Sequence, residues 1–505
     1  MKNTVRVALF LGGLTILYYL FSDYLEGGLL SYISIITTLS VIFIGFVIFL
    51  ENRHPTQTLT WIIVLGSFPL AGFIFYLLFG KNFKKEKMFR KKYFLDKQAF
   101  TKFEGDSGPP ITEKLERLGE DQRRLFNLAH KISNSPISFG TETKVLTNGE
   151  ETFHHILEAL RGATHHIHLE YYIVRNDEIG QEIKEVLIQK AKEGVEVRFL
   201  YDAVGSWNLS RRYIVEMRNA GIGIVPFGPV RVPMLNNKIN FRNHRKIIVI
   251  DGAVGFVGGL NIGDEYLGKN KAIGFWRDTH LLVQGEAVRT LQLIFLQDWY
   301  YMTNQSFLNP KYLSPPLKEN DSSGGGVQLI AGGPDNEWSV IKNIFFSMIT
   351  SANKSVWIAS PYFIPDEDIF SAIKIAALSG IDVRILVPNK PDKRIVFYAS
   401  RSYFPELLEA GVKIYEYEKG FMHSKYIVVD DELASIGTSN MDMRSFHLNF
   451  EVNAFLYKTS SIEDLSREFL KDLKDSKLID LSEFKKRNIG LRLLESTSRL
   501  LSPLL

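Results

Sequence analysis

Two stretches of this 505-residue chain decide its fold: His244-Arg-Lys-Ile-Ile-Val-Ile-Asp251 and His423-Ser-Lys-Tyr-Ile-Val-Val-Asp430. They lie 179 residues apart, and each leads to a Gly-x-x-Asn turn, at residues 258–261 and 437–440. His, Lys, Asp, Gly and Asn occupy identical offsets in the two copies. One copy would be weak evidence, but two matched copies predict a duplicated unit. We expect its two histidines and two lysines to form one composite site for a phosphodiester.

The sequence around the motifs predicts two copies of an α/β unit. We expect strands at residues 166–174, 194–201, 355–364 and 380–386 and an amphipathic helix at residues 179–193. Strands that alternate with helices are typical of an α/β sandwich. About 11 extra residues precede His244, which we assign to residues 228–237 as a candidate substrate-side loop. Two homologous halves can pack about a pseudo-two-fold axis, which would bring the two motifs face to face.

Composition divides the chain into five parts. We expect a membrane-anchoring segment at 1–98, a first α/β half at 99–313, a Pro/Ser/Gly linker at 314–326, a second half at 327–484 and a basic, leucine-rich tail at 485–505. The tail is either an amphipathic helix on the membrane interface or a segment packed on the catalytic part.

The first part of the chain is predicted to be embedded in a membrane. Residues 27–50 and 55–80 are uncharged runs of 24 and 26 residues, longer than the roughly 20 apolar residues that span a bilayer. A third run, residues 7–22, has only 16, so we expect two or three transmembrane helices. Eight Lys/Arg fall within residues 81–97, whereas the loop between the long runs holds only Arg53. The positive-inside rule then predicts a multi-pass protein of the cell membrane with its catalytic part in the cytoplasm.

The composition excludes several classes of function. The chain has no cysteine, which excludes disulfides and cysteine-ligated metal sites. A net charge of +4 is small for this length and gives no argument for nucleic acid. The sequence has neither a glycine-rich phosphate loop nor aspartates spaced for magnesium, so we expect no cofactor and no metal.

Strand geometry separates the members of each motif. His244 and Lys246 are two residues apart, so their side chains leave the same face of a strand. Asp251 lies seven residues beyond His244, about 23 Å away in an extended chain at roughly 3.3 Å per residue. We therefore expect Asp251 and, likewise, Asp430 to have structural or indirect roles.

The remaining polar residues suit phosphodiester exchange. One imidazole attacks phosphorus to form a phosphohistidine while the other protonates the leaving alkoxide and later deprotonates the acceptor. We expect the non-bridging oxygens to be bound by Lys246, Lys425, Asn261 and Asn440. A histidine with this role needs an orienting carboxylate, and Asp278 and Glu451 are the candidates. The sequence does not say which histidine each would hold.

The duplicated pattern resembles the phospholipase D superfamily and, within it, the bacterial cardiolipin synthases. The resemblance covers nearly the whole chain, including residues 52–61, 259–266, 276–280, 438–451 and 500–505. It implies transfer of a phosphatidyl group between two phosphatidylglycerol molecules, which yields cardiolipin and glycerol. It also implies an active-site set of His244, Lys246, Asp251, His423, Lys425 and Asp430, with the first-half histidine as nucleophile.

Two other functions stay open from the sequence. A membrane-bound hydrolase of the same superfamily would use water as acceptor, and a membrane scaffold would have lost catalysis. The membrane segment favours lipid over nucleic acid as substrate, and the intact motif pair disfavours a scaffold. The expected partners are therefore phosphatidylglycerol and cardiolipin in the bilayer.

Overall fold

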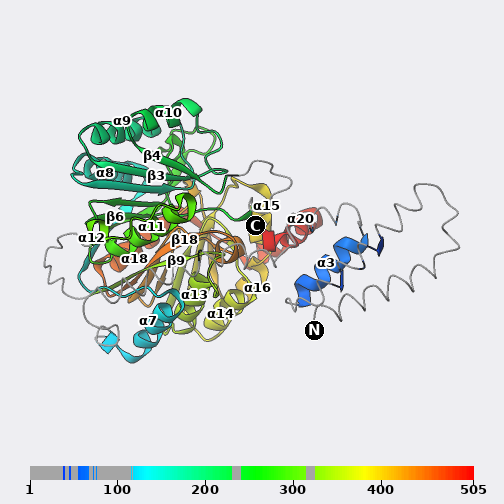
Figure 1. Cartoon of the computed structure of the whole chain (residues 1–505). Helices are drawn as coiled ribbons and strands as arrows, with labels where there is room; N and C mark the ends of the chain where they lie inside the picture. Colours follow the sequence, from blue (N-terminus) through cyan, green and yellow to red (C-terminus); the bar gives the residue numbers. More distant parts are fainter. Residues whose placement is uncertain are drawn as a thin grey trace, which may run out of the picture. The chain divides into compact units, whose positions relative to one another are not determined.

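The computed structural model describes residues 118–229, 240–313 and 325–504, residues 115–116, and isolated positions between 38 and 92 that include helix α3 (Pro55–Ser67) (Figure 1). Within this described part of the chain, no helix is both long and apolar enough to cross a membrane. The expected spans, the loop at 228–237 and the linker at 314–326 lie largely outside the described residues, and the last linker residue, Gly326, begins strand β9 (Gly326–Gly332). The chain forms two compact units, 1–85 with 231–237, and 86–230 with 238–505. Both motifs lie in the larger unit.

The first half of this unit is built on a seven-stranded sheet with the order β1-β8-β6-β5-β2-β3-β4. The strands are β1 (Thr141–Thr147), β2 (His166–Tyr171), β3 (Glu196–Asp202), β4 (Gly223–Phe227), β5 (Ile247–Ile250), β6 (Val254–Gly258) and β8 (Thr279–Gly285). β2, β3 and β4 run parallel, and the other neighbours are antiparallel. Helices α8 (Asn148–Arg161), α9 (Glu178–Lys192) and α10 (Arg211–Asn219) belong to the same half (Figure 1).

The second half repeats this strand order and adds one edge strand. Its order is β19-β13-β12-β10-β15-β16-β18-β9. The strands are β9 (Gly326–Gly332), β10 (Ser355–Ala359), β12 (Asp382–Pro388), β13 (Lys413–Tyr417), β15 (Tyr426–Val429), β16 (Leu433–Gly437), β18 (Glu451–Tyr457) and β19 (Ser476–Leu478). The expected duplication and the α/β class are therefore confirmed. The expected strands appear as β2, β3, β10 with the short β11 (Phe363–Ile364), and β12, and the expected helix appears as α9.

The remaining helices belong to both halves and the tail. They are α7 (Glu120–Ser133), α11 (Val288–Thr303), α12 (Pro310–Leu313), α13 (Val340–Thr350), α14 (Glu367–Leu378), α15 (Arg394–Arg401), α16 (Phe404–Glu409), α17 (Met443–His447), α18 (Ser460–Lys474), α19 (Leu481–Lys485) and α20 (Ile489–Arg499), with 3-10 turns η5 (Asp264–Leu267) and η6 (Ser502–Leu504). Helix α11 packs mainly on the first sheet. Helix α7 lies inside the range expected for the first half, but it packs against α13 and β9 of the second.

The two motif strands lie in the middle of the protein because they are apolar throughout. All four residues of β5 and of β15 are buried, as expected for strands covered on both faces. One hydrophobic core joins the two sheets through β5, β6, β8, β15, β16 and β18, together with α11 and α18. The halves therefore share a core, and their motifs are held in one rigid arrangement.

Two short contacts between the halves position the site. β7 (Phe275–Arg277) of the first half pairs in parallel with β14 (Gly420–Met422) of the second, with Met422 opposite Arg277. An isolated parallel bridge joins Asn243 to Phe450. Each contact ends one residue before a motif histidine on one side and one residue before a candidate carboxylate on the other.

Candidate active site

Each histidine is held by a carboxylate from the opposite half. Nδ1 of His244 donates to Oε2 of Glu451 at 2.9 Å, and Nδ1 of His423 donates to Oδ2 of Asp278 at 2.6 Å. Both carboxylates are fully buried. The structure thus brings together all four residues, and neither half contains a complete pair of its own. With Nδ1 occupied, Nε2 of each ring is left to react.

Backbone pairing explains this exchange of partners. The backbone N–H of His244 donates to the carbonyl of Phe450 at 2.9 Å, and that of His423 donates to the carbonyl of Arg277 at 2.7 Å. The residue after Phe450 is Glu451, and the residue after Arg277 is Asp278. The register of each contact therefore places His244 beside Glu451 and His423 beside Asp278. The same geometry occurs twice because the halves contact each other reciprocally.

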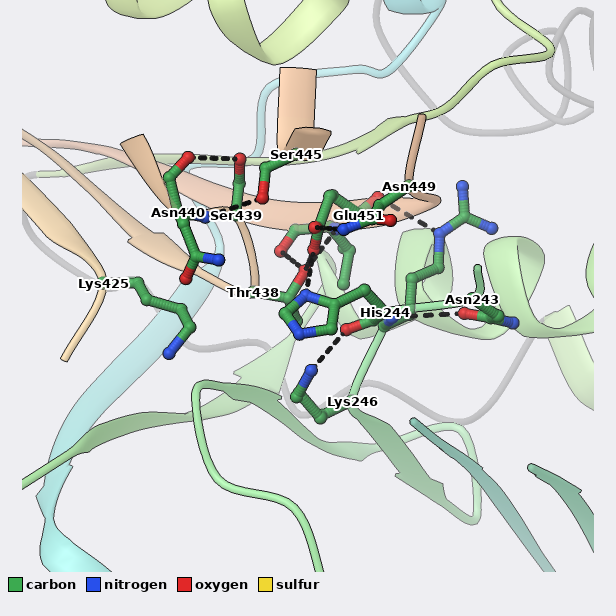
Figure 2. A network of polar contacts seen from close by, with 12 residues as sticks. Asn243, His244, Lys246, Lys425, Thr438, Ser439, Asn440, Ser445, Asn449 and Glu451 are labelled. Carbon is green, nitrogen blue, oxygen red and sulfur yellow. Dashed lines mark hydrogen bonds and ion pairs between the residues drawn. The ribbon is translucent and has the colours of Figure 1, made fainter. Parts of the chain in front are cut away.

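The two carboxylates are supported differently. Thr438 Oγ1 donates to Oε2 of Glu451 at 2.6 Å, and Asn449 Nδ2 donates to Oε1 at 3.2 Å (Figure 2). Gly259 takes the place of Thr438 in the first half. A Cβ at Gly259 would lie 2.0 Å from Oδ1 of Asp278, so only glycine leaves room for this carboxylate.

The site lysines point toward the histidines in both halves. Nζ of Lys246 donates to the carbonyl of His244 at 2.6 Å (Figure 2), and Nζ of Lys425 donates to that of His423 at 2.6 Å. Lys425 Nζ also lies 2.9 Å from Nδ1 and 3.2 Å from Nε2 of His423. Two ammonium groups thus flank the imidazoles, which suits binding of an anionic phosphodiester.

Burial keeps these groups ready to exchange protons. It lowers the pKa of both His244 and His423 to about 4, although the neighbouring carboxylates oppose the shift. Burial also lowers the pKa of Lys246 to about 7 and of Lys425 to about 8. Both imidazoles are therefore neutral at pH 7 in the free protein, as a nucleophile requires.

The motif aspartates lie elsewhere, in contrast to the active-site set that the family resemblance implies. Asp251 accepts backbone N–H groups of Thr164, His165 and His166 at 2.8–2.9 Å. Asp430 accepts the equivalent groups of residues 353–355 at 2.7–2.8 Å. Each aspartate thus holds the loop that enters β2 or β10, at the end of its strand away from the histidine, as strand spacing predicts.

We expect Asp251→Ala to lower stability more than catalysis. It removes three backbone hydrogen bonds and one from Thr164 Oγ1 and places alanine at a φ of 53°, a left-handed conformation that asparagine tolerates better. We expect a loss of about 2–4 kcal/mol for Ala and less for Asp251→Asn. Thermal inactivation midpoints measure this, with the rate per folded molecule taken at low temperature. A full loss of rate in stably folded Asp251→Asn would contradict a structural role.

The two motif asparagines already have protein partners. Asn261 accepts the backbone N–H of Ile173 at 3.1 Å and donates to the hydroxyl of Tyr266 at 2.9 Å. Asn440 donates to Asp442 at 3.0 Å, and its side chain points toward Lys425 (Figure 2). These bonds hold the turns that follow β6 and β16. Phosphate binding by Asn261 and Asn440 stays a prediction.

A buried ionic network supports His244 from behind. Arg245 pairs with Asp298 and donates to the backbone carbonyl of Glu451 at 3.1 Å. Lys92, within the basic run, lies 3.0 Å from Asp298 and 3.1 Å from Asp335, and is itself buried. Although burial opposes the charged form, Arg245 and Lys92 keep the pKa of Asp298 below its ordinary value. This network braces the backbone on which both His244 and Glu451 stand.

Two further polar groups extend the support. Glu170 is buried, accepts from Asn243 Nδ2, and has a pKa raised well above its usual range by burial and by Asp298. Asp202 accepts the backbone N–H of Asn243 at 2.9 Å. The residue before the nucleophile candidate is thus fixed at both its side chain and its backbone.

We expect Lys92→Met to slow catalysis more than Lys91→Met. Both changes remove one positive charge from the same basic run, and the structure shows Lys92 bridging two buried carboxylates. Breaking a buried pair leaves an uncompensated charge and costs about 3–5 kcal/mol. Thermal inactivation and kcat in lipid micelles measure the effect. Equal losses in the two variants would mean that the run acts only through its total charge.

Sequence reasoning missed several residues of the site. Besides the network, Tyr172 lies 5.0 Å from the His244 ring and Trp276 lies 4.8 Å from the His423 ring, measured between ring centroids. Lys92 carries no distinguishing signal among its neighbouring lysines. The aromatic side chains are equally common in ordinary cores, so the sequence alone does not single them out.

Comparison with known proteins adds a family to this geometry. A family model described as "Cardiolipin synthase, PLD-like domain" matches residues 156–299 and 345–473, and one described as "Phospholipase_D-nuclease N-terminal" matches residues 35–81. Proteins named cardiolipin synthase in Geobacillus sp. (strain WCH70) and Halalkalibacterium halodurans are 66% and 65% identical over 505 residues, covering 100% of both chains. A probable cardiolipin synthase of Bacillus subtilis is 46% identical over 481 residues, 95% of this chain and 94% of that protein.

Among solved structures, the fold is similar to that of phosphatidylserine synthase from Haemophilus influenzae Rd KW20. The TM-score is 0.57 at 17% identity, over 76% of this chain and 100% of that one. At this identity the likeness shows the fold alone.

Proposed function

The chain belongs to the bacterial cardiolipin synthases of the phospholipase D superfamily, and we propose that it transfers a phosphatidyl group between two phosphatidylglycerols through a phosphohistidine on His244. The observation that carries this proposal is the reciprocal pair of His–carboxylate dyads, each completed by the opposite half and flanked by a lysine. Two neutral imidazoles, each held at Nδ1 by a carboxylate, provide one nucleophile and one acid/base.

The reaction proceeds in two balanced steps. The anionic substrate favours protonation of His423, which therefore enters the first step as the imidazolium. Nε2 of His244 then forms a bond to phosphorus, the bond from phosphorus to the glycerol oxygen breaks, and His423 gives its Nε2 proton to the departing glycerol. In the second step, a headgroup hydroxyl of another phosphatidylglycerol gives its proton to His423 and attacks phosphorus. The N–P bond then breaks, and cardiolipin leaves. The phosphodiester bonds broken and formed are of similar energy, so the exchange is reversible.

The contacts of the two histidines support different roles for them. The Asp278 oxygen that lies 2.6 Å from His423 also accepts a longer bond from Trp276 Nε1 at 3.3 Å, whereas the Glu451 oxygen that binds His244 is shared with Thr438 at 2.6 Å. A carboxylate with less competition stabilises an imidazolium better, which suits His423 as acid. Lys246 and Lys425 bind the non-bridging oxygens, and a bound phosphate raises the pKa of both lysines, so they stay charged during the reaction.

Product analysis tests the proposal directly. The purified full chain, with phosphatidylglycerol in mixed micelles and EDTA, is expected to form cardiolipin and glycerol in equal amounts, and added glycerol is expected to reverse the reaction. Phosphatidic acid as the sole product would instead assign the protein as a hydrolase. The absence of both reactions would favour a membrane scaffold that has lost catalysis.

We infer that residues 1–98 anchor the enzyme as a multi-pass segment of the cell membrane with the catalytic halves in the cytoplasm. The two long uncharged runs and the basic run at 81–97 support this, as does the family match at residues 35–81. The chain lacks cysteine, so Ser306→Cys, at an exposed position, provides a single reactive thiol. A membrane-impermeant maleimide should label it only after cells are lysed; labelling of intact spheroplasts would reverse the topology.

A further inference from the structure

Helix α20 has the reverse of the usual polarity for a surface helix. Its inward face carries Glu495 and Ser498, which are both buried. The outward face of α20 and the turn after it, here called the apolar face, consists of large side chains that are 41–85% exposed: Ile489, Leu493, Leu494, Leu500 and Leu501. A helix against a protein core normally turns its leucines inward. An exposed cluster of this kind marks a surface that another apolar phase covers.

Polar contacts fix α20 in this orientation. Oε2 of Glu495 pairs with Arg487 at 2.8 Å, and Oε1 lies 3.8 Å from Arg401 of α15. The hydroxyl of Tyr403 donates to Ser502 just beyond the helix at 3.1 Å. Rotating the helix to bury its leucines would break these contacts, so the apolar face stays outward.

The surroundings of the apolar face are basic. Residues 485–505 contain five basic side chains and one acidic side chain. Three of the five pair with carboxylates, Lys485 with Glu409, Arg487 with Glu495 and Arg499 with Glu406, and Lys486 and Arg492 are exposed. Lys390, Lys393 and Arg394 are exposed at or just before the start of α15, next in sequence to Ile395, which is 50% exposed. A surface of exposed leucines with lysine and arginine on neighbouring segments suits a bilayer that contains anionic lipid better than it suits another apolar protein surface.

This surface lies next to the His423 side of the site. Helices α15 and α20 pack against each other (Figure 1). α15 also lines a surface pocket with Phe397 and Arg401, and Tyr362 and Asp392 line the same pocket. Tyr362 directly precedes β11, and β11 pairs with β17 (Met441–Asp442), which directly follows the motif residue Asn440. The pocket beside α15 therefore lies next to the turn of the second motif.

We propose that the apolar face of α20, with its basic rim, docks on an anionic bilayer and so holds the His423 side of the site at the level of the lipid headgroups. The inference rests on the proposed function, because it assigns the docked surface a role in delivering phosphatidylglycerol. It differs from anchoring by residues 1–98, which would tether the catalytic unit without orienting it.

Fluorescence tests where the apolar face lies. Because the chain has no cysteine, Leu494→Cys can carry a single environment-sensitive dye in the full-length protein in nanodiscs. We expect a blue-shifted, brighter emission in discs with phosphatidylglycerol than in purely zwitterionic discs, and quenching by lipids spin-labelled near the headgroup. Arg212→Cys on α10, a side chain 87% exposed, is the control and should respond to neither.

Other occupants of the face give different signals. If the apolar residues 1–98 covered it, the dye would already be blue-shifted in detergent and would ignore lipid charge. If a second copy covered it, the emission would depend on protein concentration and two dyes would self-quench. Either result would overturn the proposal.

A matched pair of variants tests the consequence for activity. Leu493→Asp and Ser496→Asp place the same charge on exposed positions of α20, but only the first removes an apolar contact. We expect Leu493→Asp to lower turnover of phosphatidylglycerol in bilayers by about 5-fold or more, mainly through KM, and to leave turnover of a short-chain substrate in micelles unchanged. Equal bilayer rates for the two variants would refute docking. If the unsubstituted protein did not turn over the short-chain substrate in micelles, the proposed function would be refuted instead.

Discussion

The His244→Ala protein should form no covalent phosphatidyl-enzyme and should lose at least about 10⁴-fold of its turnover. The imidazole of His244 is the proposed nucleophile, and alanine leaves no atom that can bond to phosphorus. The measurement uses phosphatidylglycerol labelled at phosphorus, rapid quenching in base and detection of label on the protein, because a phosphorus–nitrogen bond to histidine is stable in base and labile in acid.

His423→Ala provides the matched control. It removes the proposed acid/base and leaves the nucleophile in place, so a substrate with a good leaving group should still label the protein. The label should then persist, because no base activates the acceptor hydroxyl. Label on His244→Ala but none on His423→Ala would exchange the two roles. Label on both would place the nucleophile elsewhere in the chain.

The sequence predicted which residues meet, but not how they are paired. Equal offsets in the two motifs predicted a duplicated sheet and one composite site, and the apolar runs after Lys246 and Lys425 predicted the buried strands β5 and β15. The exchange of carboxylates depends on the register of contacts between the halves at β7–β14 and Asn243–Phe450. Such contacts join residues about 150–210 positions apart, and no local periodicity records them.

The support behind the site was hidden for a related reason. Lys92 has the same sequence context as Lys91, and its burial follows only from the positions of Asp298 and Asp335, far along the chain. Conversely, local geometry sufficed for Asp251 and Asp430. Seven residues of strand cannot fold back on themselves, so the spacing alone separated each aspartate from its histidine.

Glu451→Gln and Asp278→Asn should each slow turnover by about 10²–10⁴-fold, but at different steps. Glutamine keeps the shape of Glu451 and removes the charge that holds the Nδ1–H of His244, so attack on phosphorus becomes slow. Asparagine at 278 weakens His423 as acid and base and leaves the nucleophile oriented. KM should change little in either variant, because Lys246 and Lys425 still bind phosphate.

The leaving group distinguishes the two effects. p-Nitrophenolate leaves a phosphatidyl ester without needing a proton. This substrate should therefore restore the first step in Asp278→Asn and leave Glu451→Gln slow.

The pH dependence provides a second test. Each carboxylate raises the pKa of its histidine, so either change lowers that pKa further below about 4. For His244 this leaves a neutral imidazole over a wider range, and lowering the pH cannot rescue Glu451→Gln. For His423 it removes imidazolium, so Asp278→Asn should lose most rate at high pH with phosphatidylglycerol. Rescue of both variants by the activated ester would mean that Glu451 does not act through the nucleophile.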